Sequence, residues 1–222
     1  MENAREYSGS RFPAHKNGTT EDIKAEIQES ISVKADLGRG TAEQIAKAAN
    51  VIVTRLQAGG KLIAFGNGGS DADAQHIAAE FVGRYRVERK ALAAIALTTD
   101  SSALTAIGND YGFEEIFSRQ LEAVGKSEDV VLALSTSGNS RNVLRALESA
   151  KKMGMVTLGL SGSTGGEMRG VVDICLCVPS ASTPRIQEAH TLIIHILSGI
   201  VERAFVGVAE SLDPMNAAAA LR

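Results

Sequence analysis

Five short apolar runs, each followed within four residues by glycine or serine and then by a stretch with helical periodicity, constrain this fold most strongly. The runs are continuous in hydrophobicity and do not alternate with polar residues, which is typical of strands that helices cover on both faces. They comprise residues 62–65, 93–97, 130–134, 156–160 and 174–178. The pattern predicts an α/β fold in which a doubly wound, five-stranded parallel sheet is flanked by helices.

The remaining segments define the domain organisation. Residues 21–37 and 41–57 place apolar residues three and four apart, which predicts an N-terminal helical hairpin. The two ends of the chain lack such periodicity. In a chain of 222 residues we therefore expect an N-terminal extension at 1–20, a single domain at 21–207 and a C-terminal tail at 208–222.

Charge and hydropathy argue against several classes of protein. The chain has 23 Lys and Arg residues against 26 Asp and Glu residues, a net charge of −3, which provides no basic surface for nucleic acid. No apolar run approaches the roughly 18 residues of a membrane span, and the polar N-terminus lacks the apolar segment of a signal peptide. We expect a cytoplasmic protein that binds neither nucleic acid nor membrane.

The only two cysteines, Cys175 and Cys177, belong to the last apolar run. The two-residue period of a strand places them on one face. Oxidation of the pair or half of a metal site is conceivable, but we interpret both cysteines as small apolar residues of the core.

Two loops are candidates for binding, because ligands of open parallel sheets lie beyond the carboxyl ends of the strands. Residues 135–140, Ser-Thr-Ser-Gly-Asn-Ser, crowd four hydroxyl groups at the start of a helix, where free N–H groups and the helix dipole favour an anion such as phosphate. The alternative is a capping turn without a ligand. The segment lacks the lysine of a nucleotide-hydrolysing P-loop.

The other loop, Gly66-Asn67-Gly68-Gly69-Ser70, implies a close backbone approach or positive φ angles, and it does not match the dinucleotide fingerprint. In the helix that follows, His76 and Glu80 are four residues apart and share one face. They could bind a metal together, or Glu80 could act as a base. The alternative is an ordinary surface pair.

A second histidine, His195, lies between two isoleucines in the predicted C-terminal helix. It is either a satisfied core residue or a ligand. Gln187 is about 80° away around the helix and could reach the same site, although the angle alone favours Glu188.

Six motifs in this order resemble the SIS (sugar isomerase) family and, within it, the phosphoheptose isomerases, over about residues 21–207. The motifs are 66–70, Asp73-Ala74-Gln75-His76-Ile77-Ala78-Ala79-Glu80, Gly108-Asn109-Asp110-Tyr111-Gly112-Phe113, 135–140, Gly165-Gly166-Glu167-Met168 and Arg185-Ile186-Gln187-Glu188-Ala189-His190. The resemblance implies that the hydroxyl loop holds the sugar phosphate. It implies substrate contacts at Asn67, Gly68, Gly69, Glu80, Asn109, Asp110, Ser135, Thr136, Ser137, Ser140 and Gln187.

The resemblance also implies one zinc ion per subunit, bound by His76, Glu80, Gln187 and His195. It thus selects Gln187 over Glu188. Some relatives carry an Asp three residues before this Gln, but the position is Pro184 here, so a role for that Asp does not transfer.

The implied reaction is an aldose–ketose isomerisation of D-sedoheptulose 7-phosphate to D-glycero-D-manno-heptose 7-phosphate through an enediolate, for bacterial heptose and lipopolysaccharide precursors. Glu80 is the candidate base and His195 the candidate acid. A homotetramer with active sites between subunits is also implied.

Two other functions compete with this one. One is a non-catalytic SIS protein that binds the replication initiator, which lacks equivalents of Glu80 and His195. The other is an isomerase or sensor for a different sugar phosphate, which usually carries a second SIS domain or a DNA-binding domain. Glu80 and His195 are present here and no second SIS copy is visible, so the sequence favours the enzyme.

Overall fold

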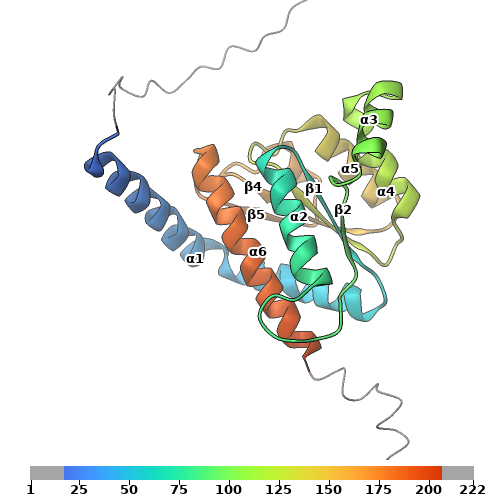
Figure 1. The fold of residues 1–222 in the computed structure, drawn as a ribbon, viewed down its shortest axis with the longest axis horizontal. Helices are drawn as coiled ribbons and strands as arrows, with labels where there is room; N and C mark the ends of the chain where they lie inside the picture. Colours follow the sequence, from blue (N-terminus) through green and yellow to red (C-terminus); the bar gives the residue numbers. More distant parts are fainter. Residues whose placement is uncertain (1–17, 207–222) are drawn as a thin grey trace, which may run out of the picture.

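A computed structural model of the chain describes residues 18–206 (Figure 1). Its five-stranded sheet is parallel throughout, with the order β2-β1-β3-β4-β5. The strands are β1 (Leu62–Gly66), β2 (Ala94–Ala96), β3 (Val130–Leu134), β4 (Val156–Ser161) and β5 (Ile174–Cys177). The predicted α/β fold is confirmed, and each strand lies within one residue of its predicted apolar run. The expectations for residues 1–17 and 207–222 lie outside the described residues.

Helices cover both faces of the sheet, as the continuous apolar runs predict (Figure 1). One face packs against α1 (Thr20–Gln57), α2 (Gly69–Val82) and α6 (Thr183–Phe205). The other packs against α3 (Ser101–Asp110), α4 (Ser118–Val124), α5 (Arg141–Lys152) and η2 (Glu167–Gly170). The short helix η1 (Phe113–Glu115) contacts α3 and α5. No helix between residues 18 and 206 is both long enough and apolar enough to cross a lipid bilayer.

The predicted N-terminal hairpin is wrong, because α1 is one continuous helix of 38 residues. Gly38 and Gly40 suggested a turn between two helices. However, the buried positions continue across them at four-residue spacing, from Val33 through Leu37 to Thr41. One face of α1 therefore packs on the domain on both sides of the glycines, which offsets the roughly 1 kcal/mol that each glycine costs a helix.

The strand order brings the two predicted binding loops together. The chain leaves β1 toward β2 on one side, while β3 lies on the other side, so the β1/β3 boundary is a topological switch point. At the carboxyl ends of these strands Asn67 and Asn142 exchange two amide hydrogen bonds of 2.8 Å. This reciprocal pair ties the loop after β1 to the helix that follows the loop after β3.

The described core also contains a neutral histidine, His190 of α6, which faces the carbonyl oxygen of Ser161 at 3.3 Å. Its side chain is fully buried. Burial lowers the pKa of His190 to about 4, although the hydrogen bond to Ser161 opposes this shift. In the unfolded chain the pKa returns to about 6.5.

We expect His190 to make stability depend on pH. The folded protein binds fewer protons here than the unfolded chain between pH 6.5 and 4, so this contribution to stability is lost as the pH falls through that window. From pH 7 to pH 5 the loss is about 2 kcal/mol in the free energy of unfolding. Urea titrations of the wild type and His190→Gln at both pH values measure it, and an equal pH dependence in the two proteins would contradict the assignment.

Candidate active site

The glycine loop opens α2 without a side-chain cap. Gly68 is the N-cap residue, with a φ of 60°, and its N-terminal neighbour Asn67 is engaged by Asn142. At Gly69 a Cβ atom would lie only 2.1 Å from the side-chain nitrogen of Gln187. The Gln187 amide, which comes from α6, thus rests on the first turn of α2, and a larger residue at position 69 would displace it.

Three side chains from α2 and α6 converge farther along the same two helices, beyond the contact between Asp73 and Thr191. His76 Nε2 lies 3.2 Å from Glu80 Oε1 and 3.2 Å from His195 Nε2. The potential ligand atoms of His76, Glu80 and His195 all lie within 4.8 Å of one another. The His76–Glu80 pair is thus more than a surface ion pair, and His195 is a half-buried member of this group and does not belong to the core.

Further side chains support the two histidines. The Tyr85 ring stacks on His195 with a centroid separation of 5.5 Å. Asp73, one helical turn before His76, is buried and accepts a hydrogen bond of 3.0 Å from Thr191 of α6. Burial raises the pKa of the Asp73 carboxyl, and Thr191 and the two histidines offset only part of that shift.

The loop that carries Tyr85 is held by a buried ion pair. Glu202 of α6 accepts backbone N–H groups from Tyr85, Arg86 and Val87 at 2.9–3.1 Å. Its carboxylate also lies 3.7 Å from the Arg89 guanidinium, and both side chains are at most 3% exposed. Burial alone would raise the pKa of Glu202, but the three N–H donors and Arg89 outweigh burial and lower it.

The hydroxyl loop, residues 135–140, forms its own network at the start of α5. Ser135 Oγ lies 3.0 Å from Ser140 Oγ and 3.5 Å from Ser137 Oγ. The Ser140 side chain makes no capping hydrogen bond although Ser140 is the N-cap residue. This absence argues against a plain capping turn, because the first N–H groups of α5 keep no side-chain acceptor from Ser140.

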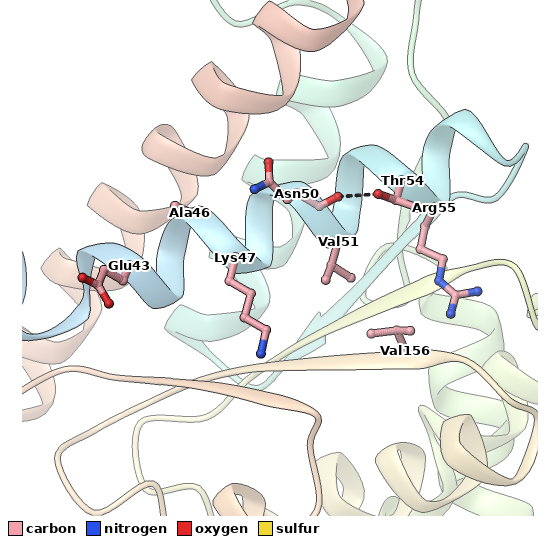
Figure 2. A pocket seen from close by; sticks show the side chains of 8 residues that line it. All are labelled: Glu43, Ala46, Lys47, Asn50, Val51, Thr54, Arg55 and Val156. Carbon is pink, nitrogen blue, oxygen red and sulfur yellow. Dashed lines mark hydrogen bonds between the residues drawn. The ribbon is translucent and has the colours of Figure 1, made fainter.

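A cavity of about 460 Å³ lies at the carboxyl edge of the sheet. Its lining includes Gly66, Asn67 and Gly68 from the glycine loop, together with Phe113 of η1. A second cavity, of about 640 Å³, lies between the exposed side of α1 and Val156 at the start of β4 (Figure 2). None of the predicted site residues lines the second cavity, which lies toward the amino edge of the sheet.

Other predicted residues lie apart from the histidine group. Asn109 and Asp110 end α3, where the Asn109 amide donates to the Asp110 carboxylate at 2.7 Å and both residues are exposed. Glu188, which the helical angle favoured over Gln187, turns toward α1, where it accepts a hydrogen bond of 2.5 Å from Ser30 and lies 3.6 Å from Lys34 Nζ.

Comparison with known proteins places the chain in a family. Residues 27–162 match the SIS domain family, and the chain therefore belongs to it. A phosphoheptose isomerase from Geobacter sulfurreducens is 54% identical over 183 residues, which make up 82% of this chain and 97% of the relative.

Solved structures agree with this assignment. The structure of phosphoheptose isomerase GmhA from Neisseria gonorrhoeae is similar with a TM-score of 0.79 and 44% identity, covering 82% of this chain and 98% of that one. A phosphoheptose isomerase from Francisella tularensis gives a TM-score of 0.81 and 38% identity, over 84% of this chain and 100% of that one. The chain is accordingly an isomerase enzyme with a SIS fold.

Sequence reasoning missed several residues around the histidine group. Asp73 had a signal, because a position three residues before His76 shares its helical face. No signal in the sequence pointed to Tyr85 or Glu202. The loop after α2 lacks periodicity, and the contact between these two residues spans 117 positions of the chain.

Proposed function

We propose that this isomerase interconverts D-sedoheptulose 7-phosphate and D-glycero-D-manno-heptose 7-phosphate through an enediolate, for bacterial heptose and lipopolysaccharide precursors. The observation that carries the proposal is the convergence of His76, Glu80 and His195 between α2 and α6, the helix pair that also brings Gln187 against Gly69 of the glycine loop. An aldose–ketose isomerisation needs a base at the carbon next to the carbonyl and an acid that moves a proton between the two oxygens. This group contains candidates for both.

Glu80 is the proposed base and His195 the proposed acid. Glu80 uses Oε1 toward His76, and its second carboxylate oxygen can accept the proton from carbon. His195 can hold or release a proton at a ring nitrogen that does not bind zinc, and the Tyr85 ring stacks on the imidazole. Such proton transfers typically contribute about 10²–10⁴-fold to a rate.

The donor set also fits a zinc ion, which we propose at one per subunit. Two imidazole nitrogens and a carboxylate are preferred ligands of zinc, and three such atoms with an open position are typical of catalytic zinc sites. Gln187, whose amide lies against Gly69, is proposed as the fourth protein ligand. A bound zinc ion would supply Lewis-acid polarisation of the substrate oxygens.

Gln187 and Glu188 provide a matched test of the metal site. We expect Gln187→Ala to weaken zinc binding by roughly 10–100-fold, because it removes the proposed fourth ligand. Glu188→Ala should leave zinc binding unchanged, because its carboxylate contacts Ser30 and Lys34 of α1. Zinc titration of the metal-stripped proteins measures both affinities, and equal losses in the two variants would argue against Gln187 as a ligand.

We propose that the hydroxyl loop binds the phosphate through Ser135, Thr136, Ser137 and Ser140, while Asn67, Gly68, Gly69, Asn109 and Asp110 contact the sugar. The start of α5 supports this role, since the Ser140 side chain caps none of its first N–H groups, and free N–H groups at a helix start attract anions. Holding the phosphate away from the reacting carbons would orient the sugar and lower the entropy cost of reaction.

Turnover of sedoheptulose 7-phosphate by the zinc-loaded enzyme, followed by NMR of the product, tests the proposal. We expect the aldose to accumulate until equilibrium is reached. When the reaction is run in D₂O, deuterium should enter the product at the carbon next to the carbonyl. Absence of turnover with sedoheptulose 7-phosphate, but turnover of another ketose phosphate, would correct the substrate. A lack of turnover with any sugar phosphate would contradict the proposed activity of this chain.

We further propose a homotetramer with active sites between subunits. Support comes from the N-terminal half of α1, where Ile23, Ile27 and Ile31 follow one another at four-residue spacing and are 53–59% exposed. Three isoleucines in a row on one helix face are typical of a surface that another chain covers. Sedimentation equilibrium should give four times the mass of one chain, and a monomer at micromolar concentration would overturn the proposal.

A further inference from the structure

The two cysteines form a thiol pair on the edge strand of the sheet. Cys175 and Cys177 are both on β5, and their Sγ atoms lie 3.6 Å apart. Contrary to the expectation from sequence, neither belongs to the core, because both are partly exposed. These are also the only cysteines of the chain, so neither has another thiol within the chain as a partner.

The environment makes the two thiols unequal. The hydrogen bond with Cys175 lowers the pKa of Cys177 to about 7, and Arg169 of η2 adds to this shift while burial opposes it. The same contact and burial raise the pKa of Cys175. Cys177 is therefore the thiol of the pair that ionises more readily, and Cys175 lies at contact distance from it.

The thiol pair lies directly behind the hydroxyl loop. A Cβ atom on Gly165 would lie 3.1 Å from Cys177 Sγ, and a Cβ atom on Gly138 would overlap the Gly165 carbonyl oxygen at 2.0 Å. Two hydrogen bonds of 2.9 Å complete the connection, from Met168 N to Gly138 O and from Glu167 N to Asn139 Oδ1. One layer of backbone, residues 165–168, thus separates the sulfur atoms from the loop.

We propose that Cys175 and Cys177 are an oxidation site at which a hydroperoxide converts the thiol pair to a disulfide and thereby weakens phosphate binding by the hydroxyl loop. Three features of a redox-sensitive cysteine are present: a thiol that ionises readily, partial exposure and a neighbouring thiol that can resolve a sulfenic acid. The effect on phosphate rests on the function proposed for residues 135–140, whereas the oxidation itself does not.

The chemistry needs only the peroxide as co-reactant. The Cys177 thiolate attacks one peroxide oxygen, the O–O bond breaks, and hydroxide leaves, which gives a sulfenic acid at Cys177. Cys175 then attacks the Cys177 sulfur, its proton combines with the departing hydroxide, and water leaves as the S–S bond forms. The hydroxide released in the first step takes up from solvent the proton that Cys177 lost on ionising. The two thiols thus lose two electrons and two protons in all, and hydrogen peroxide is reduced to two molecules of water, or an organic hydroperoxide to an alcohol and water.

Disulfide formation requires β5 and its neighbours to move. The sulfur atoms must approach from 3.6 Å to about 2.05 Å, a shift of about 1.5 Å. Within the sheet β5 pairs with β4 alone, so it can adjust more freely than a central strand. Because Cys177 Sγ packs against Gly165, we expect the shift to displace residues 165–168 and the hydrogen bonds they donate to the loop.

Peroxide treatment followed by intact-mass measurement tests the oxidation site. The wild type should lose the mass of two hydrogen atoms, remain a single covalent chain and regain its mass with dithiothreitol. Cys175→Ser should instead accumulate a sulfenic acid at position 177 that dimedone traps. Cys177→Ser should be oxidised more slowly, because the Arg169 side chain lies at Gly165 together with Cys177 Sγ and favours the thiolate at position 177. Oxidation of Cys177→Ser at the wild-type rate, or a wild type that gains oxygen instead, would overturn the proposal.

The coupling to phosphate is measured separately. Oxidised wild type should show a KM for the sugar phosphate that is about two- to tenfold higher than that of the reduced enzyme, as for one displaced hydrogen bond. The double variant Cys175→Ser/Cys177→Ser, treated identically, should keep its KM. An equal rise in both proteins would indicate methionine oxidation, and an unchanged KM in the disulfide form would refute the coupling. If the reduced enzyme has no turnover, the proposed function fails. The coupling is then tested by measuring the binding of inorganic phosphate with ³¹P NMR, in the reduced and oxidised wild type and in the double variant.

Discussion

Replacing Glu80 with glutamine is expected to lower kcat by about 10²–10⁴-fold, because the amide keeps the shape of the side chain but cannot accept a proton. The helix position and the contact with His76 remain available to the amide oxygen. Steady-state turnover of sedoheptulose 7-phosphate measures the loss. Circular dichroism and the zinc content of the same sample show whether fold and metal are retained.

Two comparisons separate the role of Glu80 as a base from its role as a ligand. A Glu80→Gln protein that retains zinc but loses turnover supports proton transfer, whereas a parallel loss of both supports metal binding. Glu188→Gln is the matched control, because it changes a carboxylate of α6 that faces α1. A decrease of less than tenfold in Glu80→Gln, with zinc bound, would exclude Glu80 as the base.

Loss of the Glu202 carboxylate is expected to have the largest effect on stability, about 3–5 kcal/mol in the free energy of unfolding. Glu202→Gln leaves the Arg89 guanidinium buried without its counter-charge, and the amide cannot accept all three N–H groups of residues 85–87 with a full negative charge. Denaturant unfolding of the metal-free proteins at equal concentration measures the difference.

Arg89→Met provides the control for that measurement. A double-mutant cycle isolates the interaction, and the double variant should be more stable than the sum of the single losses, because it removes both buried charges. In Glu202→Gln we also expect Tyr85 to lose its fixed position against His195, since its backbone is held by this carboxylate. A stability loss below about 1 kcal/mol would indicate that water enters and replaces the ion pair.

The sheet could be predicted from sequence because each buried strand is a local, continuous apolar run. The hairpin was predicted wrongly because the glycines at 38 and 40 are a local stop signal, while the continuous helix depends on burial of Leu37 and Thr41 against the rest of the domain. Tertiary packing favours the continuous helix over the hairpin, and no short window of the sequence reveals that packing.

The candidate site likewise combines features that local sequence predicts with features that depend on distant contacts. The pairing of His76 with Glu80 follows from helical spacing, and the structure places the two as that spacing predicts. The preference between Gln187 and Glu188 could not follow from their angles, because it depends on Ser30 and Lys34, which lie more than 150 residues earlier and draw Glu188 toward α1. The resemblance to the SIS family supplied this information where geometry alone did not.

The histidine group joins α2 to α6, so its members are 119 positions apart in the chain. While the chain is being synthesised from its N-terminus, the sheet can begin to form long before α6 emerges from the ribosome. The histidine group therefore forms only after most of the domain has been synthesised, because His195 is added long after His76 and Glu80. A nascent or prematurely released chain that ends before residue 195 retains the hydroxyl loop and the glycine loop but lacks the third member of the group, so incomplete products of translation cannot complete this group.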